Sequence, residues 1–576
     1  MLLHLPMLLK ELFLLALFSQ VLCLDLRALT QLNDTLGGRL ASARPTGAPC
    51  FSEDSKEECA LLGRQIMSPD YRHNTYQSFE NIQGEACIAN PSDQCLLDPT
   101  TLQAPTDSSS ASSCGQGVVS RYFIQVTGAE DVQAVFRYSR KTGHALSIKN
   151  SGHDYMMRSS RQGSLAMWTG KLRNMTYHES FSPDGCDSGA GIAPAAAITL
   201  GAGVSMGEAM AFSHDHGVLF PAAISPSIGA SGGWLLNGGH SPMSVGMGLA
   251  VDRAAQFTIV TPDGKLRTVN RCRDKELFWA LRGGGGGAFG VVLGSTHFTK
   301  PEVPVVAALF NIANATAETR RGWVELLADH MLDWTLEGWG GPSTTSMSVL
   351  VNPYLNVSEA ERMLEPAAEY MQQRGGAASF QTYPSWFDFW TQVVTGMFSA
   401  PPTVSLGVNI ASKILPKEAF TDHEKKGRMV DAIMNIEASG MQVAFLATTP
   451  ILYGQKNPGA SKDTSINPAW YRSVWHLSGY SAWNYKTTLD ERKETVLALQ
   501  NTTEVLDAIS DGGCTYSNEA DPSRKDWASE YWGDNYPKLL QVKHKVDPHN
   551  LLSCWHCVGW EPSLPSYGCI SGLYEQ

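Results

Sequence analysis

The 576-residue sequence has little positive charge: 44 Lys and Arg stand against 56 Asp and Glu, for a formal net charge of −12. No stretch gathers the basic residues into a patch. Nucleic acids and anionic membranes repel such a surface, so we expect neither as a partner. Internal repeats and coiled-coil heptads are also absent, which excludes repeat and fibrous architectures.

Long apolar runs are confined to the N-terminus, where two leucine-rich stretches flank Lys10 and Glu11. The charged pair interrupts the run and leaves it too short to span a membrane. We interpret residues 1–23 as a secretory signal peptide cleaved near Cys23 or Leu24, with a membrane anchor as the alternative. A secreted, N-glycosylated protein without stable membrane insertion is expected. Glycosylation sequons occur at Asn33, Asn174, Asn314, Asn356 and Asn501.

Metal-ligand patterns are incomplete, although the chain has 12 cysteines. Cys554 and Cys557 lack a second ligand pair at zinc spacing, so a disulfide or a free thiol is expected there. His214 and His216 lack a third ligand and are expected to end a helix before Gly217. We expect no metal site. An oxidising compartment would join the early cysteines by disulfides whose pairing cannot be read: Cys50, Cys59, Cys87, Cys95 and Cys114.

The apolar content of 43% and charged content of 17% are typical of a globular protein, and the length predicts two to three domains. Residues 24–117 are predicted to form an irregular arm rich in Ser, Pro and Cys. A strand from Tyr122 to Val126, a helix from Glu130 to Lys141 and a strand from Ala145 to Lys149 then form a βαβ-like unit that leads to His153. Further predicted elements are a strand over 197–200, a helix over 205–214, a hairpin over 256–269, a helix over 275–281, a strand over 291–298 and helices over 319–332, 358–374 and 425–437.

Glycine is concentrated in runs after residue 200. Gly285, Gly287 and Gly290 have the spacing of a dinucleotide-binding fingerprint, but a helix precedes them and a strand follows. That order is the reverse of the Rossmann arrangement, so we expect no NAD site. Bare backbone N–H groups still suit an anion or a flat ring. Three runs that bracket strands favour a long buried cofactor over ligand-free tight loops.

Several long motifs carry a clear resemblance. The segments Ile148 to Tyr155, Gly238 to Asp252 and Leu277 to Val292, followed by the tail segments 516–521 and 531–550, resemble flavoproteins of the vanillyl-alcohol-oxidase type. The berberine-bridge-enzyme-like branch, especially its fungal secreted oxidases, is most similar. The resemblance covers about residues 118–300 and 505–560.

This resemblance implies an α+β fold with an FAD-binding domain of the PCMH type that is split in sequence. The expected domains are the FAD-binding domain over 118–300, an inserted substrate domain over 301–505 with an antiparallel sheet and helices, and a C-terminal berberine-bridge-like segment over 506–576. The antiparallel sheet would cover the flavin ring.

The resemblance also implies a covalent FAD, held by His153 through the C8 methyl group. A histidine after a glycine is otherwise most often a turn residue. Many relatives attach the flavin a second time through a cysteine, whose place is taken here by Ser225, so a single link is expected. The other residues expected at the cofactor are Ser151, Gly152, Asp154, Ser225, Gly229, Gly232, Gly233, Gly238, Gly239, Arg282, Gly290, Val291 and Asn518.

Two residues are candidates for the catalytic base. His476 matches the base position of the branch, where plant members commonly have glutamate, and Glu519 stands where they have a tyrosine. A hydrogen-bonded sheet histidine is the alternative for His476. Trp470, Trp475 and Tyr480 are candidates for an apolar substrate pocket, or for plain core.

We therefore expect a secreted FAD-linked oxidase that takes a hydride from a carbon next to an alcohol or amine and passes electrons to O2, giving H2O2. Small or secondary-metabolite alcohols are the leading substrates. A carbohydrate oxidase and an O2-independent dehydrogenase are alternatives of the same fold, and a non-catalytic flavin-binding extracellular protein is an alternative of another class. The oligomeric state is not predicted.

Overall fold

The structure, a computed structural model, describes residues 26–105, 113–186, 191–398, 406–562 and 567–575. The expected signal peptide, residues 1–23, lies outside this range. Within it, no helix combines the length and apolarity that crossing a membrane requires. Mixed helices and sheets confirm the predicted α+β class.

A four-stranded sheet leads to the His153 loop. Its strands, in the order β1-β2-β4-β3, are β1 (Leu40–Ser42), β2 (Tyr122–Gln125), β4 (Leu165–Trp168) and β3 (Leu146–Lys149). Both β2 and β3 run parallel to β4, which lies between them. Helices α2 (Leu26–Thr35) and α5 (Ala129–Thr142) pack on this sheet through one apolar cluster that includes Leu29, Val135 and Leu146.

A five-stranded antiparallel sheet follows, in the order β5-β6-β10-β8-β9. Its central strand is buried or half-buried along its whole length, on both faces of the sheet. Its strands are β5 (Met175–Phe181), β6 (Ala195–Gly201), β8 (Ala254–Val260), β9 (Leu266–Asn270) and β10 (Val291–Phe298). Strands β7 (Val218–Leu219) and β11 (Lys300–Pro301) form a separate short antiparallel pair.

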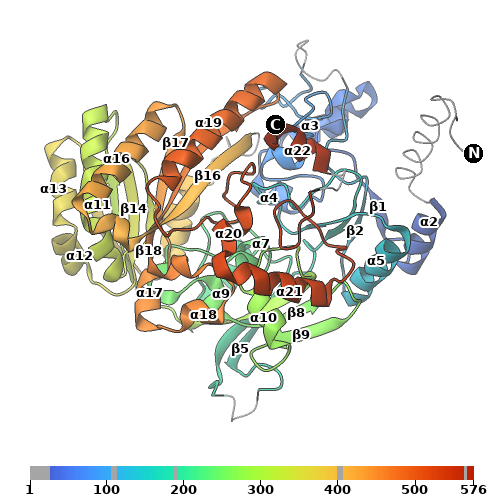
Figure 1. Cartoon of the computed structure of the whole chain (residues 1–576), viewed down its shortest axis with the longest axis horizontal. Coiled ribbons are helices and arrows are strands. Elements are labelled where there is room, and N and C mark those ends of the chain that lie inside the picture. The colour runs from blue at the N-terminus through green and yellow to red at the C-terminus, as the bar shows by residue number, and fades with distance from the viewer. Residues whose placement is uncertain (1–25, 106–112, 187–190, 399–405, 563–566, 576) are drawn as a thin grey trace, which may run out of the picture.

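The third sheet is antiparallel and has seven strands, in the order β15-β12-β14-β13-β17-β18-β16. Helices α11 (Ala317–Leu336), α16 (His423–Ala438) and α19 (Leu489–Asp507) pack beside it, on the left of the molecule (Figure 1). Its strands are β12 (Val305–Asn311), β13 (Gly341–Ser343), β14 (Met347–Asn352), β15 (Ala377–Tyr383), β16 (Gly407–Pro416), β17 (Gln442–Ala447) and β18 (Ser473–Trp483).

The C-terminal segment returns to the first part of the chain. Helix α22 (Gly568–Tyr574, dark red in Figure 1) is joined to the N-terminal arm, which includes helix α3 (Lys56–Gly63), by a disulfide between Cys87 and Cys569. The remaining helices are α4 (Pro69–His73), α6 (Met206–Asp215), α7 (Gly233–Leu236), α8 (Ser244–Met247), α9 (Ala250–Arg253), α10 (Lys275–Leu281), α12 (Val357–Met363), α13 (Glu365–Gln373), α14 (Trp386–Phe389), α15 (Thr395–Phe398), α17 (Ile451–Lys456), α18 (Ala460–Asp463), α20 (Trp527–Trp532) and α21 (Tyr536–Val546).

Two local predictions were wrong. The single helix expected over 358–374 is two helices, α12 and α13, that meet at Leu364. Pro366 is the second residue of the second helix, and its missing N–H cannot continue the hydrogen-bond ladder of the first. The arm over 24–117 is less irregular than expected, because β1 joins the first sheet and α2 packs against α5.

The cysteine predictions were confirmed. Cys554 and Cys557 form a disulfide, and the early cysteines are oxidised. The five disulfides among the described residues are Cys50–Cys59, Cys87–Cys569, Cys95–Cys114, Cys186–Cys272 and Cys554–Cys557.

Helix α6 does end at Asp215, just before His216 and Gly217. The exact domain boundaries remain a prediction.

Candidate active site

A cavity of about 430 Å³ is lined by residues from several of the segments that the sequence singled out. The His153 loop, the glycine runs over 229–240 and 283–290 (the first and second glycine runs below) and the tail around Glu519 contribute residues to its walls. Strands β16, β17 and β18 contribute alternate residues, as the two-residue period of a strand requires. We call this face the roof; it consists of Val408, Ile410, Ala444, Leu446, Ser478 and Tyr480.

The His153 loop is anchored by a buried lysine. Strand β3 ends at Lys149, whose side chain is fully buried and donates to the backbone carbonyls of Thr75 and Tyr76 at 2.7 and 2.9 Å. Burial lowers the pKa of Lys149 to about 7. Gly152 has a φ of +90°, so the chain turns sharply directly before His153.

His153 uses one ring nitrogen for contacts with the protein. Its Nε2 atom is 2.7 Å from Ser227 Oγ and 3.8 Å from Glu80 Oε2. Ser227 Oγ lies 3.2 Å from Ser225 Oγ in turn. Burial lowers the pKa of His153, against the opposing effect of Glu80, so the ring is neutral near pH 7 and can act as a nucleophile.

The glycines serve two different purposes. A Cβ atom at Gly229 would lie 1.8 Å from Asn150 Oδ1, so this glycine permits close packing of two chain segments. Gly287 lines the cavity with a φ of +77°, and a Cβ atom there would find no protein atom nearer than Cys554 Sγ at 3.8 Å. A side chain at Gly287 would therefore project toward the cavity.

Three ionisable side chains meet beside the roof. Glu519 lines the cavity, with Oε1 3.7 Å from His240 Nε2 and Oε2 3.6 Å from His476 Nε2. His240 Nδ1 is 3.2 Å from Thr448 Oγ1. His476 is fully buried, and neither of its ring nitrogens has a hydrogen-bond partner among the described residues.

Burial sets the charges of this cluster. It lowers the pKa of His476 to about 4, so that ring is neutral at pH 7. Burial also disfavours the charged form of Glu519, but the two histidines outweigh that effect and hold the pKa of the carboxyl below its usual value. The cluster therefore presents a carboxylate to the cavity and a neutral imidazole behind it.

His240, His476 and Glu519 are also ligand types that bind metal ions, and their donor atoms lie within 4.8 Å of one another. The sequence did not indicate this trio, because its members come from three distant segments. The absence of a metal stays a prediction.

The cavity includes most of the expected site residues. Those that line it are Ser151, Gly152, His153, Asp154, Ser225, Gly232, Gly233, Gly290, Asn518 and Glu519. The expected residues outside its lining are Gly229, Gly238, Gly239, Arg282, Val291 and His476. Arg282 is held instead over the ring of Phe278, at 4.3 Å, and donates to the carbonyl of Asp463. Tyr480 lines the cavity, whereas Trp470 and Trp475 are core residues.

Several site residues were missed. Glu80 lies in the arm that the sequence marked as irregular, so no pattern pointed to it. His240 follows two glycines, as His153 follows one, and this repeated Gly-His signal could have found it. Ser517 Oγ donates to Asn237 Oδ1 at 2.6 Å and so joins the tail to the first glycine run.

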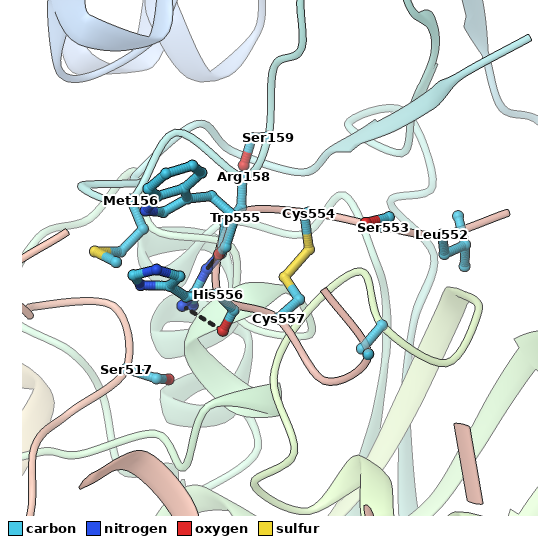
Figure 2. The surroundings of a disulfide bond; sticks show 12 residues. Met156, Arg158, Ser159, Ser517, Leu552, Ser553, Cys554, Trp555, His556 and Cys557 are labelled. Carbon is cyan, nitrogen blue, oxygen red and sulfur yellow. Dashed lines mark hydrogen bonds between the residues drawn. A yellow bond between two sulfur atoms is a disulfide. The ribbon is translucent and has the colours of Figure 1, made fainter. Parts of the chain in front are cut away.

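The disulfide Cys554–Cys557 closes a turn in the cavity wall (Figure 2). Arg158, five residues after His153, donates to the carbonyl oxygens of Trp555 and His556 at 2.9 and 3.3 Å. The C-terminal turn and the His153 loop are thereby held together.

Comparison with known proteins identifies the class. A family model described as "FAD binding domain" matches residues 120–270, and one described as "Berberine and berberine like" matches residues 515–556. The chain is 36% identical over 565 residues to the FAD-linked oxidoreductase OXR2 of Pyricularia oryzae, covering 95% of each chain. It is 37% identical to the FAD-linked oxidoreductase cheF of Chaetomium globosum, covering 94% of this chain and 88% of that protein.

Solved structures have the same fold. The VAO-type flavoprotein MtVAO615 from Myceliophthora thermophila C1 aligns with a TM-score of 0.80 at 24% identity, over 93% of this chain and 95% of that one. A glucooligosaccharide oxidase from Acremonium strictum aligns with a TM-score of 0.61 at 17% identity, over 76% of this chain and 92% of that one. The chain belongs to the berberine-bridge-enzyme-like branch of the vanillyl-alcohol-oxidase-type FAD-linked oxidoreductases, and is an FAD-dependent oxidoreductase.

Proposed function

We propose that the protein is a secreted oxidase that removes a hydride from a carbon bearing an alcohol or amine of an apolar small molecule and passes the electrons to O2, giving H2O2. The observation that carries this proposal is the cavity in which His153 and the carboxylate of Glu519 both appear. FAD supplies the hydride acceptor when it is bound.

The residues present fit a covalently held FAD. His153 Nε2 is engaged by Ser227, which leaves Nδ1 as the nitrogen for attachment. The glucooligosaccharide oxidase is described as carrying a 6-S-cysteinyl, 8α-N1-histidyl FAD, and N1 is the Nδ1 atom. Ser225 cannot form the cysteinyl bond because it has no sulfur. We therefore infer a single link, through His153 Nδ1.

Glu519 is the proposed base. It reaches the cavity, and its lowered pKa keeps it ionised, so it can accept the proton of a substrate hydroxyl or amine while the hydride leaves. His240 Nε2 and His476 Nε2 lie 3.7 and 3.6 Å from its two oxygens, and both histidines favour the ionised form of the carboxyl. His476 does not line the cavity, which favours Glu519 over His476 as the group that meets the substrate.

The roof supports an apolar substrate. Val408, Ile410, Ala444 and Leu446 offer no hydrogen bonds through their side chains, and only Ser478 and Tyr480 on this face can. A sugar would leave most of its hydroxyls unpaired against such a surface, at a cost in binding. An apolar alcohol therefore fits better than a carbohydrate.

Secretion rests on separate observations. The five disulfides among the described residues are typical of an oxidising compartment. Among the sequons, Asn33 is half-buried and Asn174, Asn314, Asn356 and Asn501 are exposed. N-glycosylation at the exposed sites is part of the proposal.

The test begins with the purified protein and its His153→Ala variant. Flavin fluorescence should survive in the wild-type band of a denaturing gel and be absent from the variant band. Peroxide release is then measured with apolar alcohols, amines and oligosaccharides of matched concentration. Reduction of the flavin by an apolar alcohol or amine without oxygen, followed by peroxide formation in air, supports the proposal. Turnover of oligosaccharides alone would contradict the apolar substrate, and reduction without peroxide would indicate a dehydrogenase.

A further inference from the structure

Glu80 lies beside the proposed attachment residue. Its Oε2 atom is 3.8 Å from His153 Nε2, and the two side chains are only 13% and 16% exposed. Ser227 Oγ lies 2.7 Å from the same nitrogen. Nε2 therefore faces a carboxylate and a hydroxyl, and neither contact involves Nδ1.

The position of Glu80 is built into the fold. Its backbone N–H donates to the carbonyl of Gly152 at 3.3 Å, directly before His153. The preceding residues are tied to the end of β3, because Lys149 donates to the carbonyls of Thr75 and Tyr76. The arm is thus attached to the His153 loop through backbone groups, and a substitution at the Glu80 side chain leaves these bonds in place.

We propose that Glu80, assisted by Ser227, positions His153 and accepts its Nε2 proton while FAD is attached covalently. This rests on the proposed link through His153. As Nδ1 forms a bond to the C8 methyl carbon of the flavin, that carbon loses one proton and Nε2 loses another. The two electrons that remain in the ring pass to O2, which takes up two protons and becomes H2O2.

The chemistry explains why a carboxylate belongs here. When Nδ1 acquires its third substituent, the ring becomes positive in a site that water barely reaches, and burial opposes that charge. A negative group 3.8 Å from Nε2 offsets it, and Ser227 keeps the ring turned so that Nδ1 remains available. Glutamine at position 80 would keep the shape and remove the charge.

The experiment measures the covalent share of bound flavin in the full-length protein. Wild type, Glu80→Gln and the control Glu302→Gln are produced in one host, and FAD is added after purification. Total flavin is read from the absorbance of the folded protein, and covalent flavin from gel fluorescence and intact mass over time. Glu302 is a matched control because it also contacts a histidine, His214 Nδ1 at 2.9 Å, outside the cavity lining.

We expect Glu80→Gln to remain yellow but to attach FAD about 10²-fold more slowly, in the range of a lost acid–base group. Glu80→Asp should recover part of the rate, and Glu302→Gln should match wild type. Attachment in Glu80→Gln at the wild-type rate overturns the inference. If Glu80→Gln does not fold, the rate of FAD attachment is measured in Ser227→Ala instead. Attachment at the wild-type rate in that variant overturns the proposal. Wild-type protein that never retains flavin after denaturation contradicts the histidyl link itself, which is a different failure.

Discussion

The two histidines that the sequence placed at the flavin lie in contrasting surroundings. His153 has a nitrogen bonded to Ser227, a carboxylate nearby and a position in the cavity wall. His476 is fully buried, has no hydrogen bond among the described residues and lies outside the cavity lining. Burial lowers the pKa of both, but of the two only His153 lines the cavity.

This difference separates two tasks. A nucleophile needs access and a free lone pair, which the His153 loop offers. A group that supports a neighbouring base needs only a defined place, which strand β18 gives His476 through the alternation of its side chains. Of the cluster His240, His476 and Glu519, Glu519 is then the proposed base that meets the substrate.

The largest effect on turnover is expected from Glu519→Gln. Glutamine fills the same space but cannot accept the substrate proton, so flavin reduction measured by anaerobic stopped flow should slow by about 10²- to 10⁴-fold. The visible spectrum should show that the flavin stays bound. A rate near that of wild type would remove Glu519 from the chemistry.

A smaller effect is expected from His476→Gln. If His476 only holds the carboxylate, the same stopped-flow rate should fall by about tenfold, less than for the lost base itself. The comparison would be reversed if His476→Gln slowed reduction more than Glu519→Gln, because His476 would then be the base.

The pH dependence of stability sharpens the contrast further. His476 has a pKa of about 4 in the folded protein, below the usual value of about 6.5 in an unfolded chain. The unfolded state therefore takes up the proton first, and stability is lost as the pH falls from 6.5 to 4. The loss per such histidine is at most about 1.4 kcal/mol per pH unit.

His73, with a pKa of about 4 in the folded protein, adds to the same loss. Melting temperatures between pH 7 and pH 4.5 should fall less steeply in His476→Gln than in wild type. His423→Gln, at an exposed histidine that begins α16, is the control and should keep the wild-type slope. Equal slopes in all three proteins would show that His476 is not buried in its neutral form.

No effect is expected from removal of metal ions. If His240, His476 and Glu519 act as an acid–base cluster, dialysis against EDTA should leave turnover and the flavin spectrum unchanged. Activity that is lost and then restored by Zn²⁺ would assign the trio to a metal instead.

Sequence patterns predicted the fold well where the signal is local. The ranges of α10 and β10 were correct, because the helix and strand on either side of the second glycine run differ clearly in periodicity. The break between α12 and α13 was missed because Pro366 is tolerated at the start of a helix as well as being a helix breaker.

The site was predictable to the extent that motifs mark it. The resemblance indicated His153 and Glu519, which both line the cavity. Glu80 could not be found in this way, because its role depends on which segments meet in space. Glu80 reaches His153 through backbone contacts between an arm and a loop that are some 70 residues apart.

The most direct test of the account is a peptide map of the native protein. After proteolysis, mass spectrometry should find FAD on the peptide that contains His153 and on no other. Flavin released free from the protein, or attached to a peptide without His153, would contradict the assignment of this loop as the anchor.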